Sequence, residues 1–149
     1  MNKSIVILIL VIFYTSCSSG LTIMDEKDLI LKKGRMYKPK FLFFMGEEKP
    51  YNGVAIKYFE GGAKECQGPY VNGRREGIWT YWHEPIPKKL NRGIREGKGP
   101  YKIGIRDGYW TYWYTNGVKR EEGNFQGQER VGKWIYYNKD GEIIHVREF

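Results

Sequence analysis

The chain has 149 residues, of which 41% are hydrophobic and 16% aromatic, and its formal net charge is +8. This length fits one domain with a modest core, and the apolar content excludes an intrinsically disordered chain. The basic balance is compatible with a nucleic acid, an anionic membrane surface or an acidic protein as the partner.

The first sixteen residues have the features of an export signal. Lys3 gives a basic start, and the apolar run 5–14 is shorter than the roughly 20 residues that a helix needs to cross a bilayer. Thr15 and Ser16 then lead to Cys17, an arrangement that resembles the bacterial lipoprotein signal. The resemblance implies a signal peptide over residues 1–16, acylation of Cys17 (palmitate included), and a lipid-anchored protein of the bacterial cell envelope.

Ser18 follows the cysteine, and by the same resemblance it favours sorting to the outer membrane. A plain secretory signal or an uncleaved anchor are the alternatives. We expect residues 17–27 to form the lipidated cysteine and a polar tether. If Cys17 is acylated, Cys66 is the sole free cysteine, and we expect it to be buried in a strand.

Residues 28–52 have a β-like pattern without the regular spacing that follows them. The apolar run Phe41–Met45 is too short for a helix and favours a buried strand. Terminal repeats of an array are commonly atypical. We therefore expect residues 28–52 to be a degenerate unit that caps the domain 28–149.

A glycine–aromatic spacing then recurs from Gly53, Gly77, Gly108 and Gly132, at intervals of 24, 31 and 24 residues. In the units from Gly77, Gly108 and Gly132 aromatic residues alternate at period two after the first glycine, which places them on one face of a strand. The unit from Gly53 lacks the tryptophan. Asn-Gly or Asp-Gly follows in the last two units, as expected of a hairpin turn. The pattern predicts an all-β fold: an elongated stack of antiparallel β-hairpins, as a single layer or open twisted sheet, with no substantial helix.

Stacked in register, the hairpins would place their aromatic residues in two ladders. One ladder would contain Trp79, Trp110 and Trp134, and the other Tyr81, Tyr112 and Tyr136. The same register explains the period, because a unit this short cannot bury its own apolar face and must stack on its neighbours.

The longest interval has seven extra residues, which fall between Trp82 and Gly93 at the tip of a hairpin. A single altered tip on a regular array is where we expect specificity to reside. Basic residues gather around it, although such charges are often simply solvated. The candidate partner-binding residues are Arg74, Arg75, Lys88, Lys89, Arg92, Arg95, Lys102 and Arg106.

The segment from Gly68 to Trp79, with Tyr70 and the Asn72-Gly73 turn, resembles the MORN repeat. The Gly-x-Trp units are similar to a bacterial MORN-variant group, the YwqK-type toxin–antitoxin antitoxins. The resemblance covers residues 28–149 and implies an elongated hairpin stack used for protein or membrane contacts.

The pattern offers little for catalysis. His83 and His145 are the only histidines and fall at unrelated places in their units, so no metal-ligand spacing is present. Acidic residues, Glu121 among them, lie beside Lys or Arg, which cross-strand charge pairing explains better than acid–base catalysis. We expect no enzyme activity, no metal and no cofactor. Export argues against nucleic acid, despite the mixture of basic and aromatic residues.

The leading hypothesis is a membrane-anchored, non-catalytic module that binds a protein or an anionic envelope surface. The alternative is an antitoxin or immunity protein that neutralises a toxin by direct binding. A purely structural envelope component is a third hypothesis. The sequence leaves the partner, the oligomeric state and the side of the membrane open.

Overall fold

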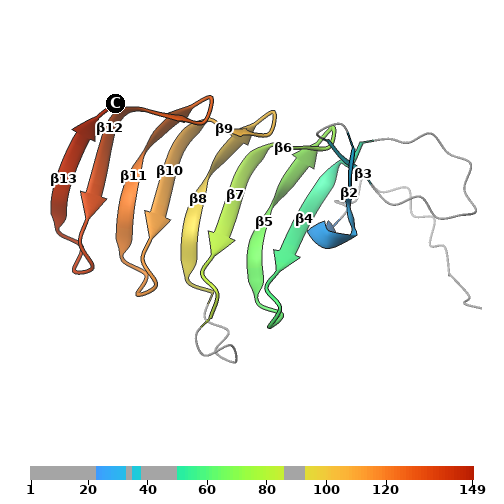
Figure 1. Cartoon of the computed structure of the whole chain (residues 1–149), viewed down its shortest axis with the longest axis horizontal. Helices are drawn as coiled ribbons and strands as arrows, with labels where there is room; N and C mark the ends of the chain where they lie inside the picture. Colours follow the sequence, from blue (N-terminus) through green and yellow to red (C-terminus); the bar gives the residue numbers. More distant parts are fainter. Residues whose placement is uncertain (1–22, 33–34, 38–49, 86–92) are drawn as a thin grey trace, which may run out of the picture.

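The computed structural model describes residues 23–32, 35–37, 50–85 and 93–149 (Figure 1). These residues form an open 11-stranded sheet and a separate two-stranded sheet. The one helical segment among them is a three-residue 3-10 turn. The predicted all-β, open stack of hairpins is confirmed.

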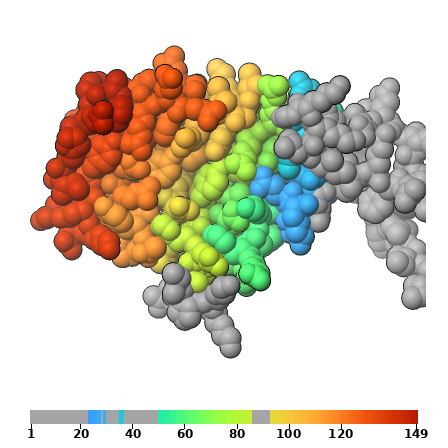
Figure 2. Space-filling model, viewed as in Figure 1, coloured from blue at the N-terminus to red at the C-terminus, as the bar shows by residue number. Residues whose placement is uncertain are grey.

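Four antiparallel hairpins form the body of the large sheet, and they begin at or near the four unit glycines. The paired strands are β4 (Gly53–Tyr58) and β5 (Lys64–Val71), β7 (Gly77–Trp82) and β8 (Arg95–Lys102), β10 (Gly108–Trp113) and β11 (Lys119–Gln126), and β12 (Glu129–Tyr137) and β13 (Ile143–Glu148). The hairpins lie side by side in chain order, and their side chains form one continuous surface (Figure 2).

Tight turns with positive φ connect successive hairpins. Asn72 and Gly73, with φ of 49° and 70°, lead from β5 into the short strand β6 (Arg74–Arg75). The equivalent turn leads from β8 into β9 (Ile105–Arg106). In the third turn Gln128 adopts a φ of 77°. A non-glycine residue therefore takes the left-handed conformation where the two earlier turns place a glycine.

The N-terminal described residues pack at the β4 end of the sheet. β1 (Ile23–Asp25) pairs in parallel with β4, and η1 (Glu26–Asp28) follows it. β2 (Ile30–Lys32) and β3 (Arg35–Tyr37) form the small sheet. The predicted run Phe41–Met45 lies outside the described residues.

The tether predicted over residues 17–27 is corrected at its C-terminal end, because residues 23–27 belong to the fold. Ile23, Met24 and Asp25 align with three consecutive residues of β4. Glu26 is half-buried and forms an ion pair with Arg75. A short polar segment looks solvated in sequence, and only its tertiary partners reveal that it is docked.

Each of the three hairpins that follow β5 has one tryptophan that is almost completely buried. Trp79, Trp110 and Trp134 are 0–1% exposed, and each indole N–H donates a 3.0 Å hydrogen bond to a carbonyl of the neighbouring strand. A glycine lies under each ring. A Cβ on Gly68 or Gly99 would lie 2.3 Å from the indole, and one on Gly123 would lie 2.4 Å away. Each of these glycines lies six positions after the glycine at the tip of its hairpin, Gly62, Gly93 or Gly117, so close approach of the indole explains why glycine recurs there.

The aromatic residues interleave, which refines the two ladders predicted from sequence. Tyr101 lies between Trp79 and Trp110, with edge-to-face contacts at 6.0 and 5.3 Å between ring centroids. Phe125 lies between Trp110 and Trp134 in the same way. The strand between two tryptophan strands adds its own ring, so the tryptophans do not stack on one another.

Candidate functional site

Three arginines occupy equivalent places in successive repeats, on the face of the sheet that holds the tryptophans: Arg75, Arg106 and Arg130. Each donates a hydrogen bond from Nη1 to the hydroxyl of the tyrosine six positions later, over 2.8, 3.1 and 2.6 Å. Each guanidinium also lies over an aromatic ring. The rings are those of Trp79, Phe125 and Trp134, and their centroids lie 4.2, 4.3 and 4.1 Å from the guanidinium carbon. Stacking on an aromatic face is favourable for a planar cation. The arginines therefore form a second layer over the aromatic row.

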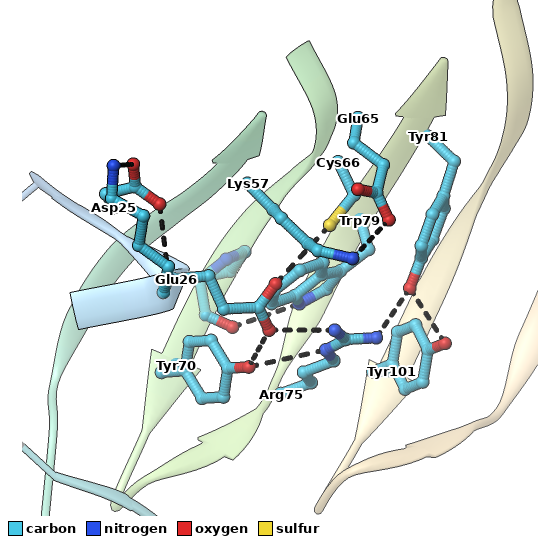
Figure 3. Close-up of polar contacts among 12 residues, drawn as sticks. Asp25, Glu26, Lys57, Glu65, Cys66, Tyr70, Arg75, Trp79, Tyr81 and Tyr101 are labelled. Carbon is cyan, nitrogen blue, oxygen red and sulfur yellow. Dashed lines mark hydrogen bonds and ion pairs between the residues drawn. The ribbon is translucent and has the colours of Figure 1, made fainter. Parts of the chain in front are cut away.

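Arg75 is neutralised by a carboxylate from η1 (Figure 3). Its Nη2 lies 2.8 Å from Oε1 of Glu26, whose side chain is 12% exposed. The Tyr70 hydroxyl donates to the same oxygen, and the Cys66 thiol donates to Oε2 at 3.6 Å. The Tyr81 hydroxyl accepts from Arg75 and contacts the hydroxyl of Tyr101 at 3.0 Å. These groups form one hydrogen-bonded cluster.

The cluster shifts the pKa of its members in consistent directions. Burial alone would raise the pKa of Glu26, but hydrogen bonds from Tyr70 and Arg75 outweigh it and lower the pKa. Burial and the hydrogen bond to Glu26 raise the pKa of Tyr70. Burial beside Glu26 raises the pKa of the Cys66 thiol to about 12. Cys66 is therefore a buried, protonated thiol, as expected from sequence.

Arg130 is neutralised by a carboxylate from the neighbouring strand. Its Nη2 lies 2.8 Å from Oε2 of Glu121, whose side chain is 11% exposed. Glu121 is aligned with Tyr112 on one side and with Tyr136 on the other. Its carboxylate therefore lies between two tyrosine strands, beside the arginine.

Arg106 has no carboxylate within ion-pair distance among the described residues. In this repeat the position equivalent to Glu121 is Gly97. Gly97 is aligned with Tyr81 on one side and with Tyr112 on the other. A hollow of about 310 Å³ opens at this point, lined by Arg106 and both tyrosines. Glu96 also lines the hollow, at the bulge of β8.

The basic residues predicted to bind a partner are not brought together in one patch. Arg75 and Arg106 belong to the aromatic face, whereas Arg74 and Lys102 lie beside the turns between hairpins. Arg95 lies over Trp113, which by strand alternation projects to the opposite face. Lys88, Lys89 and Arg92 lie outside the described residues.

Sequence reasoning missed four residues of this layer: Glu26, Gly97, Glu121 and Arg130. Arg130 could have been found from the intervals, because it follows Arg106 by 24 positions and Arg106 follows Arg75 by 31. Glu121 was expected only to form a charge pair. No periodic signal marks Glu26, because it comes from outside the repeats.

The face of the sheet opposite the tryptophans is open to solvent. Ile78, Tyr109 and Val146 project from it and are 51%, 50% and 46% exposed. Lys64 lies over the ring of Trp82 at 5.9 Å, and Arg95 lies at the same distance from Trp113. The face therefore combines apolar, aromatic and basic side chains.

Within the described ranges, no three His, Cys, Asp or Glu side chains are grouped in a way that could hold a metal ion. His83 contacts the carbonyl of Trp113 at 2.9 Å, and His145 packs against Tyr136. The two histidines lie in different hairpins and do not share a site. The same residues include no helix with the length and apolar character needed to span a membrane.

The chain matches no protein-family model, and no curated protein matches it in sequence.

Proposed function

We propose that this chain is a lipid-anchored, non-catalytic module of the bacterial cell envelope that binds an acidic protein partner. The observation that carries the proposal is the open sheet face, on which large apolar side chains are about half exposed beside cations stacked on tryptophan. Interfaces are enriched in aromatic residues and arginine, and exposed apolar patches commonly mark them. The net charge of +8 favours an acidic partner.

The resemblance to MORN-repeat variants supports the same proposal, because such hairpin stacks are used for protein or membrane contacts. Neutralisation of a toxin, the function implied by the YwqK-type group, is one form of binding to a protein partner. Anchoring rests on the apolar run and Cys17 near the N-terminus. Anchoring and binding are separable, and each has its own test.

Replacing Cys17 with serine is expected to abolish lipid attachment. Serine has no thiol to acylate, and a single apolar segment of this length is too short to span a bilayer. Incorporation of labelled palmitate into the wild-type chain and its loss in Cys17→Ser would be followed in the membrane fraction. Equal labelling of both proteins would contradict acylation at Cys17.

Replacing Ile78 and Tyr109 with aspartate is expected to reduce recovery of the partner at least about tenfold, because a buried unpaired charge costs well over 1.4 kcal/mol. The full chain would be tagged, cross-linked in native envelopes and purified. The matched control is Ile103→Asp, at an exposed isoleucine in the turn after β8. Unchanged recovery in the double variant, or equal loss in the control, would contradict binding through this face.

A further inference from the structure

The repeats of this protein provide an internal comparison at the layer of arginines. The arginine, the tyrosine six positions later and the aromatic ring beneath are present in three successive repeats. A carboxylate that pairs with the arginine is present in only two of these three described repeats. Arg75 and Arg130 each have a carboxylate oxygen at 2.8 Å, supplied by Glu26 and Glu121.

The middle repeat has the same cation without the acid. Gly97 takes the position of Glu121, since each is aligned with the second aromatic residue of the hairpin on either side. Arg106 keeps its hydrogen bond to Tyr112 and its contact with Phe125. Among the described residues its charge has no ion pair. A half-buried cation without an opposite charge nearby is less favourable than one in an ion pair, so this place favours an external anion.

The hollow has room for a small planar group. Gly97 provides no side chain, and the hollow of about 310 Å³ is flanked by the rings of Tyr81 and Tyr112. Arg75 also lines it, but Glu26 already neutralises that cation. Guanidinium groups bind carboxylates through parallel N–H···O bonds in a plane. In the next repeat the group that occupies the equivalent place is itself a carboxylate.

We infer that the hollow between Gly97 and Arg106 is a binding site for a carboxylate, presented by an acidic side chain of the protein partner. The inference rests on the proposed function for the source of the carboxylate and on the geometry alone for its chemistry. Arg106 contributes the charge and Tyr112 holds its guanidinium in place. Glu96 lies at the same hollow and disfavours the ligand through like charge.

The site is tested with acetate as the probe, on the ¹⁵N-labelled full chain in a nonionic detergent. The side-chain N–H resonances of Arg106 and Trp110 report on the hollow, since both residues line it. We expect a saturable shift with a dissociation constant on the order of 1 mM, as is reasonable for so small a ligand. Chloride at the same ionic strength is expected to give none. A response that does not saturate, or an equal one with chloride, would overturn the site.

Two variants test the hollow, one by filling it and the other by removing its positive charge. Gly97→Glu supplies the carboxylate that the next repeat has at Glu121, and it is expected to weaken acetate binding at least about tenfold. Its Cβ would lie 3.0 Å from the Tyr112 ring, which must move by a few tenths of an ångström. Arg106→Gln removes the positive charge without filling the hollow, and it is expected to weaken acetate binding by a similar factor. Undiminished binding in either folded variant would overturn the assignment.

Two further variants control for charge. Lys98→Glu changes the net charge in the same direction as Gly97→Glu, and it lies on the other face of the same strand. It is expected to keep acetate binding. Glu96→Gln removes the like charge and is expected to tighten binding about two- to threefold. If Lys98→Glu lost as much acetate binding as Gly97→Glu, the loss would be explained by long-range charge alone, and the site would be overturned.

The source of the carboxylate is distinguished with short peptides. A peptide with blocked ends and one glutamate is expected to shift the same resonances, and its glutamine counterpart is not. Binding only by a peptide with a free C-terminal carboxylate would overturn the assignment to an acidic side chain. If phosphate bound as tightly as acetate, the hollow would be a general anion site, and its assignment as a carboxylate site would be overturned.

Acetate binding and partner recovery test the carboxylate site and the proposed function separately. If acetate binds and Gly97→Glu abolishes that binding but leaves partner recovery intact, the hollow is a carboxylate site that the partner does not use. If acetate does not bind while Ile78→Asp/Tyr109→Asp still loses the partner, the proposed function stands and the carboxylate site is overturned.

Discussion

Replacing Gly99 with alanine is expected to destabilise the fold by about 3 kcal/mol, through the overpacking of a buried indole. The added Cβ would lie 2.3 Å from Trp110, far inside contact distance. The indole cannot simply retreat, because it is 1% exposed and its N–H is bound to the Pro100 carbonyl at 3.0 Å. Either the strands separate or the tryptophan leaves the core.

The measurement is urea denaturation of the full chain in detergent, followed by tryptophan fluorescence and circular dichroism. A matched control is Gly93→Ala, where the added Cβ lies 3.5 Å from Trp82, an ordinary contact. That variant is expected to change stability by less than about 1 kcal/mol. Combining Gly99→Ala with Trp110→Leu should cost less than the sum of the single changes, because the two positions share one contact. A loss below about 1 kcal/mol in Gly99→Ala would contradict this packing.

Replacing Arg75 with methionine is expected to destabilise the fold by about 2–4 kcal/mol near neutral pH, because it leaves Glu26 charged and half-buried. Methionine keeps much of the aliphatic contact but removes the 2.8 Å ion pair and the bond to Tyr81. The exposed pair between Lys57 and Glu65 provides the control. Lys57→Met, on a side chain that is 48% exposed, is expected to cost less than about 1 kcal/mol.

The loss in Arg75→Met should depend on pH. In the wild-type protein the pKa of Glu26 is lowered, so its contribution is fully present above the unfolded value of about 4.3 and is lost as the pH falls through the folded pKa. Without Arg75, burial is opposed only by hydrogen bonds such as that from Tyr70, so Glu26 becomes protonated at a higher pH. The variant should therefore be closest to the wild type in acid.

Denaturation at about pH 7 and about pH 3 measures this difference, on either side of the reference pKa of glutamate. The double variant Glu26→Gln/Arg75→Met removes both charges and is expected to recover part of the loss at neutral pH. An equal loss at both pH values, or no recovery in the double variant, would contradict a charge-based origin.

The hairpin repeat was predictable because it depends on local signals. Aromatic residues at period two and glycines at fixed turns indicate strands and reversals without any knowledge of tertiary contacts. The burial of Trp110 follows from the same alternation. The recurrence of glycine at 68, 99 and 123 is visible in the sequence. The cause of that recurrence is not, because it is an indole from the next strand that lies against the glycine.

The arginine layer was only partly predictable. Arg75 and Arg106 were singled out as cations for a partner, yet the structure places both over aromatic rings and gives Arg75 an internal acid. That acid, Glu26, lies 49 positions away in sequence. No spacing rule connects residues that far apart when one of them lies outside the repeats.

Local signals along the chain specify the architecture of this protein: a stack of β-hairpins of fixed period with Trp79, Trp110 and Trp134 on one face, and an N-terminal segment with the features of a lipoprotein signal. Which arginines are neutralised depends on contacts between elements that are distant in the chain. Strand alternation is a property of the backbone and therefore follows from neighbouring residues in the sequence. An ion pair depends instead on which carboxylate an adjacent strand or the docked η1 turn brings within reach. Gly97, one glycine among 19, leaves Arg106 without an ion pair among the described residues.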